Sequence, residues 1–184
     1  MALSHAIMVS LLDRPQTGYE LSQRFEKTVG FFWKASFQQI YQQLHKMAKA
    51  GWVSGETVAQ TDRPNRIVYT LTDCGREVLD EWVATPTDPP SVKEELLVKL
   101  FALGDADTDT LYEELQRRKA FHQDRLAWYE AVMAEHYPDP AQLTARQKGR
   151  YLGLRMGILS EQTSLDWCAE AVQLVNGLRE SEKT

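Results

Sequence analysis

One stretch of this 184-residue chain, residues 36–76, constrains the fold most, because its predicted elements follow one another in a fixed order. Residues 36–50 are predicted to form an amphipathic helix with glutamines, a tyrosine, a histidine and lysines on its polar side. An extended run follows, and a basic tip at residues 61–66 leads into the β-branched run 67–71 and a helix from residue 72. This is the order of a winged helix-turn-helix, in which the first of these helices enters a DNA major groove.

Capping signals mark where the other helices of the first half begin and end. Thr17 and Glu20 have the spacing of a capping box, in which each side chain bonds the backbone amide of the other residue. They predict a second helix that ends at Gly30, after an N-terminal first helix. Ser36 and Gln39 repeat the spacing at the start of the third helix.

The third helix has a predicted inner face of apolar residues at helical spacing. These residues are Phe37, Ile40, Leu44, Met47 and Ala48. Gly51 is the expected left-handed residue after the helix, and Trp52 is placed to cover Met47 as the hydrophobic contact of that cap. The sequence therefore predicts a helix that is anchored on one side and polar on the other.

Three prolines within residues 85–91 predict a stiff linker and a domain boundary. We expect a winged helix-turn-helix domain over residues 1–84 and a helical domain over residues 92–184. The expected fold class is mainly α, an α+β winged helix followed by an all-α dimerisation domain.

The second half is predicted to be helical throughout, with one helix over residues 92–103 and longer ones over residues 108–137 and 144–178. Their apolar stripes are wide and little chain remains to cover them, so we expect a homodimer. The residues expected to form the dimer contact are Leu100, Phe101, Leu126, Tyr129, Met133, Leu154, Ile158, Leu165 and Val172. Gly153 and Gly157 predict a place where two helices approach closely.

Composition and motifs exclude several classes of protein. No stretch approaches the roughly 18 apolar residues of a membrane span. Cys74 and Cys168 lie far apart and match no metal or redox spacing, which suits a reducing cytoplasm. The histidines lack ligand spacing, so we expect no metal and no cofactor. Ser160 and Ser164 lack the sharp glycine-bounded turn of a nucleophile, and we expect no enzyme.

The net charge of −5 is divided unevenly along the chain. Residues 1–76 carry nine Lys and Arg against six Asp and Glu, whereas residues 77–184 carry twelve against twenty. A mildly basic first half can meet phosphates while an acidic second half keeps the molecule soluble.

These residues resemble those of the PadR family of bacterial transcriptional regulators over residues 1–83. The resemblance rests on Thr17-Gly18-Tyr19-Glu20-Leu21, Ile40-Tyr41 with Leu44, Gly51-Trp52-Val53, Arg63-Pro64-Asn65-Arg66, and Tyr69-Thr70-Leu71-Thr72 with Gly75-Arg76. The second half is similar to the longer branch that includes a virulence-gene activator, in which residues 92–101 would open a dimerisation region. Gln42 stands where the family commonly has proline, which affects contacts at the groove.

Three groups of residues are candidates for DNA contact. An amide can pair bidentately with adenine and a lysine can donate to guanine, although such a face is also typical of a solvated helix. The candidate base-reading residues are Gln38, Gln39, Gln42, His45 and Lys46, with Lys49 on the same face. The candidates for phosphate contact are Tyr19, Lys34, Ser36 and Tyr41, of which Tyr19 can equally pack on a neighbouring helix. The candidates at the wing are Arg63, Asn65 and Arg66.

Aromatic residues in the second half suggest a pocket between subunits for a small aromatic effector, because aromatic faces hold flat organic ligands well. The candidates are Trp128, Tyr129, Tyr151 and Trp167. The alternative is that these side chains form the core of the dimer.

The sequence thus predicts a cytoplasmic, homodimeric regulator that binds a palindromic DNA operator and acts as a repressor, with activation left open by the resemblance. Dimer geometry would set the spacing of the half-sites. One alternative is a winged-helix module that binds protein and not DNA, which the overall acidity favours. A third is an α-helical enzyme that uses the aromatic residues of the second half.

Overall fold

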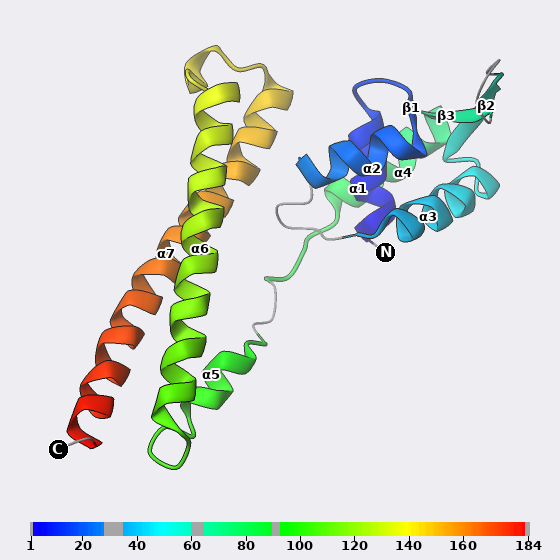
Figure 1. The fold of residues 1–184 in the computed structure, drawn as a ribbon. Coiled ribbons are helices and arrows are strands. Elements are labelled where there is room, and N and C mark those ends of the chain that lie inside the picture. Colours follow the sequence, from blue (N-terminus) through cyan, green and yellow to red (C-terminus); the bar gives the residue numbers. More distant parts are fainter. Residues whose placement is uncertain (1, 28–34, 60–64, 90–92, 183–184) are drawn as a thin grey trace. The chain divides into compact units, whose positions relative to one another are not determined.

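The structure is a computed structural model of the chain, and it describes residues 2–27, 35–59, 65–89 and 93–182. The chain divides into two compact units, Met1–Pro89 and Pro90–Thr184 (Figure 1). Helices dominate both units, and a small sheet lies in the first, so the predicted fold class is confirmed.

The first unit has the element order that the sequence predicts. Its elements are α1 (Ala2–Leu11), β1 (Gln16–Thr17), α2 (Gly18–Lys27), α3 (Phe37–Lys49), β2 (Val53–Val58), β3 (Arg66–Leu71) and α4 (Asp73–Ala84). The sheet is antiparallel with the order β1-β3-β2, so the central strand β3 pairs with both of its neighbours. The hairpin of β2 and β3 begins directly after α3, as in a winged helix-turn-helix.

One apolar core holds α3 against the other elements of this unit. The side chains of Ile40, Leu44 and Met47 are fully buried. They pack in one cluster with residues of the first two helices, the sheet and the fourth helix, which include Ile7, Met8, Leu21, Phe25, Tyr69 and Leu79. Phe37 and Ala48, which the sequence assigns to the same face, are exposed, so that part of the prediction is wrong.

Both predicted capping boxes are present. The Thr17 backbone N–H donates to Glu20 Oε2 at 2.8 Å, and the Glu20 N–H donates to Thr17 Oγ1 at 3.1 Å. The Ser36 N–H donates to Gln39 Oε1 at 2.8 Å, and the Gln39 N–H donates to Ser36 Oγ at 3.2 Å. These pairs satisfy amides that the first turn of a helix leaves without a partner, and so they fix where α2 and α3 begin.

The end of α3 has the predicted left-handed cap. Gly51 has a φ of 75°, and its N–H donates to the Ala48 carbonyl at 3.1 Å. The Trp52 N–H reaches back to the Met47 carbonyl at 2.9 Å, which completes a Schellman motif. The half-buried Trp52 side chain packs against the core. The direction in which β2 leaves α3 is therefore fixed.

The second unit consists of α5 (Glu95–Leu100), α6 (Thr108–His136), the short 3-10 helix η2 (Pro140–Gln142) and α7 (Ala145–Glu182). The long helices α6 and α7 form an antiparallel hairpin, and α5 lies beside the first turns of α6 (Figure 1). The predicted helix over residues 92–103 is shorter in the structure, and Gly104 with a φ of 107° follows the turns after it. None of the helices in the described ranges combines the length and apolar character that crossing a bilayer requires.

Several residues predicted to face a second subunit are instead buried within this unit. Leu126, Tyr129, Leu154 and Ile158 belong to the buried core of the single chain. The ring of Tyr129 lies against Gly157 so closely that a side chain there would touch it at 3.1 Å, and this is the close helix approach that the glycine predicts. Packing of α6 on α7 already removes these four residues from water within one chain, and a dimer contact by them stays a prediction.

The other predicted contact residues have mixed environments. Leu100 and Val172 are half-buried against the small core of Leu96, Leu115 and Val175 in the same unit. Two more, Met133 and Leu165, are also partly buried. Phe101 alone among the predicted set is almost fully exposed, with 91% of its surface accessible.

Candidate nucleic-acid interface

The outward side of α3 carries most of the residues predicted to read bases. Those that are exposed on this helix include Gln38, Gln42, His45, Lys46 and Lys49. Because the opposite side of the helix is buried, these polar side chains all project from the side that faces away from the core. The helix therefore offers amide, imidazole and ammonium groups from a rigidly held backbone.

Gln39 and Ser36 have a structural task as well. The carbonyl oxygen of Gln39 accepts the Ser36 backbone N–H, and the Ser36 hydroxyl accepts the Gln39 N–H. Bidentate pairing with adenine needs both the oxygen and the NH2 group of an amide. In Gln39 the cap uses one lone pair of that oxygen and holds the amide near the helix start, while its NH2 group remains available for donation.

Tyr41 fixes the start of α2 against α3. Its half-buried ring covers Gly18, where an added Cβ would lie 2.5 Å from the ring atom Cζ. The ring of Phe37 packs on its other side, with 4.4 Å between ring centroids. Burial raises the pKa of the neighbouring Tyr69, and the proximity of Tyr41 raises it further. Tyr41 thus has a packing role that its predicted phosphate contact did not include.

Tyr19 lies in the first turn of α2 with 60% of its surface exposed, which leaves its hydroxyl accessible. Its neighbour Glu20 serves the capping box, and the backbone hydrogen bond from Thr17 is the main cause that lowers the pKa of Glu20. The positive charges of Arg14 and Arg66 lower that pKa further. The start of α2 therefore lies within electrostatic reach of the wing strand.

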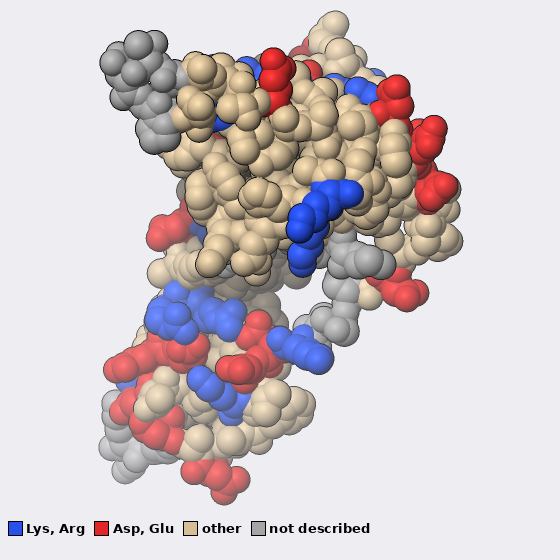
Figure 2. All heavy atoms as spheres, turned by 90° about the vertical axis from the view of Figure 1, so that its right-hand side faces the viewer, with Lys and Arg blue, Asp and Glu red and all other residues tan. Residues whose placement is uncertain are grey.

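Charge on the face drawn in Figure 2 is scattered. Single Lys and Arg side chains stand among uncharged surface and acidic side chains, and they do not gather in one patch. A modest basic character agrees with the small excess of positive charge in residues 1–76.

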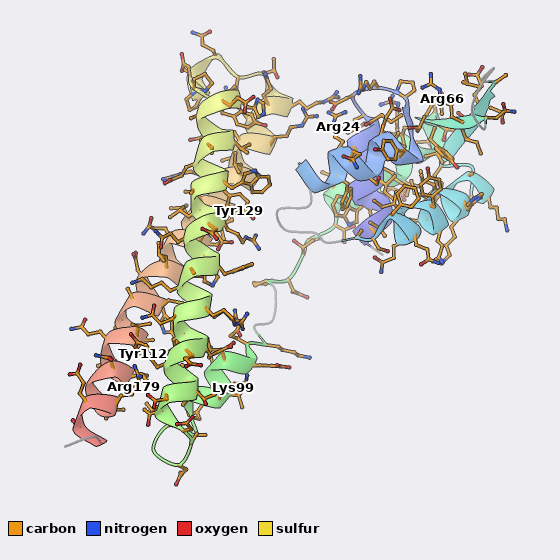
Figure 3. The ribbon with its side chains drawn as sticks, in the orientation of Figure 1. Arg24, Arg66, Lys99, Tyr112, Tyr129 and Arg179 are labelled. Carbon is orange, nitrogen blue, oxygen red and sulfur yellow. The ribbon has the colours of Figure 1, made fainter. Side chains whose placement is uncertain are left out.

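The two strands of the wing hairpin are β2 and β3. Arg66 opens β3 opposite Val58, and its exposed side chain projects from this end of the sheet (Figure 3). Asn65 precedes it and is also exposed. The predicted contact residues Lys34 and Arg63 lie outside the described residues.

A tight junction holds the wing to the end of α3. The Thr72 hydroxyl points to the carbonyls of Gly51 at 2.7 Å and Trp52 at 3.0 Å, and the Thr72 N–H donates to the Trp52 carbonyl at 3.1 Å. The Gly75 N–H donates to Thr72 Oγ1 at 3.0 Å. A Cβ on Gly75 would lie 2.7 Å from Leu71 Cδ1 and closer still to the Trp52 carbonyl oxygen. Only glycine fits this position without displacing backbone.

The four aromatic residues predicted for an effector site do not line one cavity. Tyr129 is buried in the core, and Tyr151 packs edge-to-face on Tyr137 with 6.2 Å between centroids. Trp128 is exposed and lies beside Tyr129. Trp167 borders an open hollow of about 350 Å³ within the second unit. Within a single chain the four residues therefore have different surroundings, and a pocket that they share between two subunits stays a prediction.

The cavity beside Trp167 is lined by both apolar and polar residues, most of which the sequence did not predict. Leu96, Leu97 and Cys168 contribute to its lining, together with Arg118 and His122. Burial raises the pKa of the Cys168 thiol, so the thiol is kept neutral. Residues far apart in the sequence meet here, and no local spacing could have indicated the site.

Two polar residues of the cavity lining, Arg118 and His122, are held by carboxylates. Arg118 pairs with Glu94 at 2.6 Å, and His122 Nδ1 lies 2.6 Å from Glu161 Oε2. Glu161 is buried and also pairs with Arg125 at 3.0 Å. A buried carboxylate needs such partners, because an isolated charge in this position would lose its hydration. These ion pairs fix the positions of the Arg118 and His122 side chains on α6.

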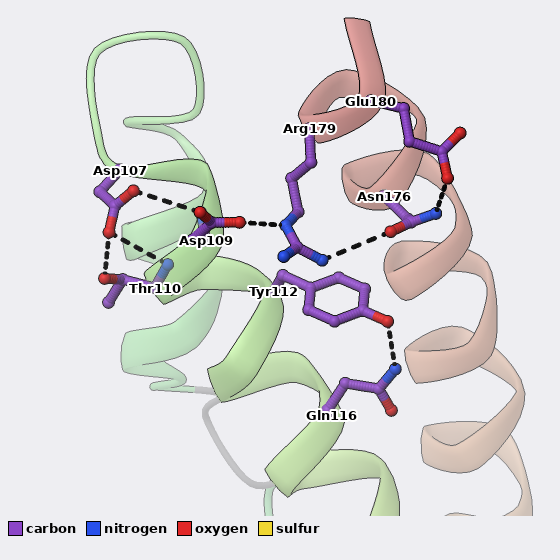
Figure 4. A network of polar contacts seen from close by, with 8 residues as sticks. All are labelled: Asp107, Asp109, Thr110, Tyr112, Gln116, Asn176, Arg179 and Glu180. Atoms are coloured by element: carbon purple, nitrogen blue, oxygen red, sulfur yellow. Dashed lines mark hydrogen bonds and ion pairs between the residues drawn. The ribbon is translucent and has the colours of Figure 1, made fainter. Parts of the chain in front are cut away.

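A second polar network ties the first turn of α6 to the last turns of α7. Arg179 Nε lies 2.5 Å from Asp109 Oδ1, and its guanidinium lies 3.9 Å from the centroid of the Tyr112 ring (Figure 4). Asn176 Oδ1 accepts from the same guanidinium at 3.4 Å. The hydrogen bond to Asp109 raises the pKa of Arg179. These contacts hold the start of α6 against the end of α7, at the end of the helix pair that is opposite the connecting loop.

Comparisons with known proteins agree with both halves of this architecture. A family model described as the transcriptional regulator PadR-like family matches residues 7–81, and one described as virulence activator alpha C-term matches residues 92–176. The chain is 35% identical over 189 aligned residues to the probable transcriptional regulator Rv1176c of Mycobacterium tuberculosis, with 97% of this chain and 100% of that protein covered.

Two further proteins extend the similarity. The structure of the Vibrio cholerae virulence activator AphA matches with a TM-score of 0.79 and 31% identity, over 96% of this chain and 99% of that one. The negative transcriptional regulator PadR of Bacillus subtilis is 27% identical over 179 residues, covering 95% of this chain and 97% of that protein. Its structure in complex with p-coumaric acid matches with a TM-score of 0.74 and 26% identity, over 96% of this chain and 99% of that one.

Proposed function

Because the chain belongs to the PadR-like family of transcriptional regulators, we propose that it binds double-stranded operator DNA as a homodimer, with α3 of each subunit in the major groove. The observation that carries this proposal is the two-sided character of α3. Ile40, Leu44 and Met47 anchor one side, while amides and cations project from the other. A regulator of this kind acts where the chromosome lies, so we propose a cytoplasmic location.

The exposed residues of α3 divide the work of recognition. Gln38 and Gln42 can each pair with the edge of an adenine, and Lys46 can donate to guanine. His45 and Lys49 lie on the same exposed side and add donors toward base edges or phosphates. Gln39 contributes mainly through its NH2 group, because its oxygen accepts the Ser36 N–H in the helix cap.

Phosphate contacts orient the helix without adding sequence information. Tyr19 and Ser36 lie at the starts of α2 and α3, where hydroxyls and backbone amides meet phosphate oxygens well. Asn65 and Arg66 act from the wing toward the flanking backbone. Lys34 and Arg63, predicted from the sequence, belong to the same proposal.

The dimer is best supported by apolar residues that this chain leaves in water. On α7 the exposed residues at helical spacing are Leu152, Met156, Leu159, Leu174 and Leu178. Phe101 and Val98 near the end of α5 are also highly exposed. A surface this apolar on a folded chain marks an interaction site, and a second copy of the chain is the partner that is always present. These residues replace the buried ones in the proposed interface.

We further propose that the cavity beside Trp167 receives a small aromatic effector. Its lining includes the apolar side chains of Leu96, Leu97 and Trp167, together with Arg118. The Bacillus subtilis relative has been solved with p-coumaric acid, an aromatic carboxylic acid. Such a ligand would regulate DNA binding by preferring one arrangement of the two subunits, and only a difference in affinity between arrangements can shift it. Repression follows where the operator overlaps a promoter.

The test is a binding assay on the operator, which sequencing of DNA that co-purifies with the protein would identify. Fluorescence anisotropy should show affinity falling by about 10³-fold or more between 50 and 200 mM salt if six or more phosphates are contacted. The double variant Gln42→Ala with Lys46→Ala should lose discrimination between operator and random DNA. Lys148→Ala, which removes an exposed lysine of α7, is the matched control.

Two results would count against the proposal. Salt-independent binding, or none, would favour a winged-helix module that recognises protein. Unchanged discrimination by the double variant would remove α3 from the groove. Repeating the assay with p-coumaric acid tests the effector site, since release of DNA by the wild type and not by Trp167→Ala is expected.

A further inference from the structure

Phe37 occupies an unusual position for a large apolar side chain. It is the first residue of α3, and 51% of its surface is exposed, although its spacing from Ile40 and Leu44 predicts burial. It does not belong to the core cluster that contains those two residues. The core therefore does not explain why this side chain is apolar.

The ring of Phe37 is nevertheless held in place from behind. Tyr41, one turn further along α3, packs against it with 4.4 Å between centroids and an angle of 39° between the ring planes. Tyr41 in turn rests on Gly18, which has no side chain to hold it off. Gly18 thus contacts Tyr41, and Tyr41 contacts Phe37, which is the exposed member of the three.

The start of α3 is also fixed. The capping box of Ser36 and Gln39 determines the backbone around Phe37. In helix-turn-helix proteins, the first residues of the recognition helix are the ones that contact base edges. A rigid backbone and a supported ring mean that little conformational freedom is lost when the ring meets a surface.

A phenyl ring has no donor or acceptor, so it gains nothing from phosphates or from the polar edges of bases. The apolar group in the major groove is the C5-methyl of thymine. Resting on the proposed function, we propose that Phe37 contacts the C5-methyl group of one thymine in each half-site and so contributes to operator specificity. Gln38 and Gln42, beside it on α3, then pair with neighbouring bases.

The test removes the methyl group and the ring separately. Each operator thymine is replaced in turn by uracil, which differs only by the missing methyl. At one position per half-site, uracil should weaken binding of the wild type about fourfold, as expected for burial of one methyl group. Phe37→Ala should bind thymine and uracil operators equally, because the partner of the methyl is gone. Phe37→Leu should retain part of the difference.

The measurement is made by anisotropy at a salt concentration low enough for every variant to bind. Val83→Ala, which trims an exposed apolar residue of α4, is the control and should keep the full sensitivity to uracil. Folding of each variant is verified by its thermal unfolding curve, and Phe37 lies outside the core cluster that sustains this unit.

Two outcomes would overturn the inference. One is a wild type that is insensitive to uracil at every thymine, and the other is equal sensitivity in the wild type, Phe37→Ala and Phe37→Leu. Either result leaves salt-dependent operator binding intact. A wild type that fails to bind DNA would instead refute the proposed function, so the two failures are distinguishable.

Discussion

Replacement of Gly75 by alanine should destabilise the winged-helix unit, because the junction between α3, β2 and α4 closes on this residue. The added methyl group would lie 2.7 Å from Leu71 Cδ1 and 3.0 Å from the carbonyl carbon of Trp52. The leucine side chain can move, but the Trp52 carbonyl is held by hydrogen bonds from the Thr72 N–H and hydroxyl. The backbone of Trp52 or of the first turn of α4 must therefore shift.

The size of the effect follows from three contributions. Forcing a methyl group into packed surroundings costs about 1–3 kcal/mol. Displacement of the Trp52 carbonyl weakens its hydrogen bond from the Thr72 N–H, which contributes about 1 kcal/mol. Alanine in a helix regains up to about 1 kcal/mol relative to glycine. The net loss is ~2 kcal/mol, which is about 8–16 °C in Tm for a unit of this size.

Differential scanning calorimetry of the full chain measures this loss, since the two units can unfold in separate transitions. The control is Gly177→Ala on α7, where an added Cβ meets nothing within 4 Å and a helix-favouring residue should be neutral or slightly stabilising. An unchanged Tm for Gly75→Ala would refute the reasoning, because it would mean that the junction yields without cost. Operator affinity should fall with stability, since the same junction orients the wing.

Two other perturbations probe the ends of helices. Arg179→Lys should lower the Tm of the second unit by a few degrees, nearly as much as Arg179→Ala does. The reason is that an ammonium group cannot contact Asp109 and Asn176 and also lie flat on the Tyr112 ring. A Tm for Arg179→Lys equal to that of the wild type would contradict this account. At the start of α2, the hydrogen bond from Thr17 lowers the pKa of Glu20 below its ordinary 4.5. The stabilisation from Glu20 should therefore be complete above that pH and be lost as the pH falls through the lowered folded value. Thermal melts between pH 3 and pH 6 should show a smaller pH dependence for Glu20→Gln than for the wild type, and identical slopes would argue against the capping role.

Local signals predicted the first unit well. The capping boxes and the left-handed Gly51 depend on residues within one or two turns, so the sequence contains all the information that they need. Periodicity placed α3, but it could not show that burial begins only at Ile40. Where a core ends is decided by neighbouring elements. The exposure of Phe37 is therefore determined by tertiary packing and not by local sequence.

The second unit was harder to predict for the same reason. A wide apolar stripe predicts that a helix has partners, but it does not say which residue faces which partner. Leu154 turns toward α6, whereas Leu152 and Met156 on the same helix stay in water. The pairing of Glu161 with His122 joins residues 39 apart in the sequence. No spacing rule connects them, since α6 and α7 must first dock.

The exposed apolar residues along α7 affect how the stability of the protein depends on its concentration in a cell. If a second subunit covers these residues, as proposed, the protein becomes more resistant to unfolding as its concentration rises. Newly made chains at low copy number would be the most open to proteolysis. A low concentration of the regulator would thus lead to faster degradation, and its turnover rate should slow as expression increases.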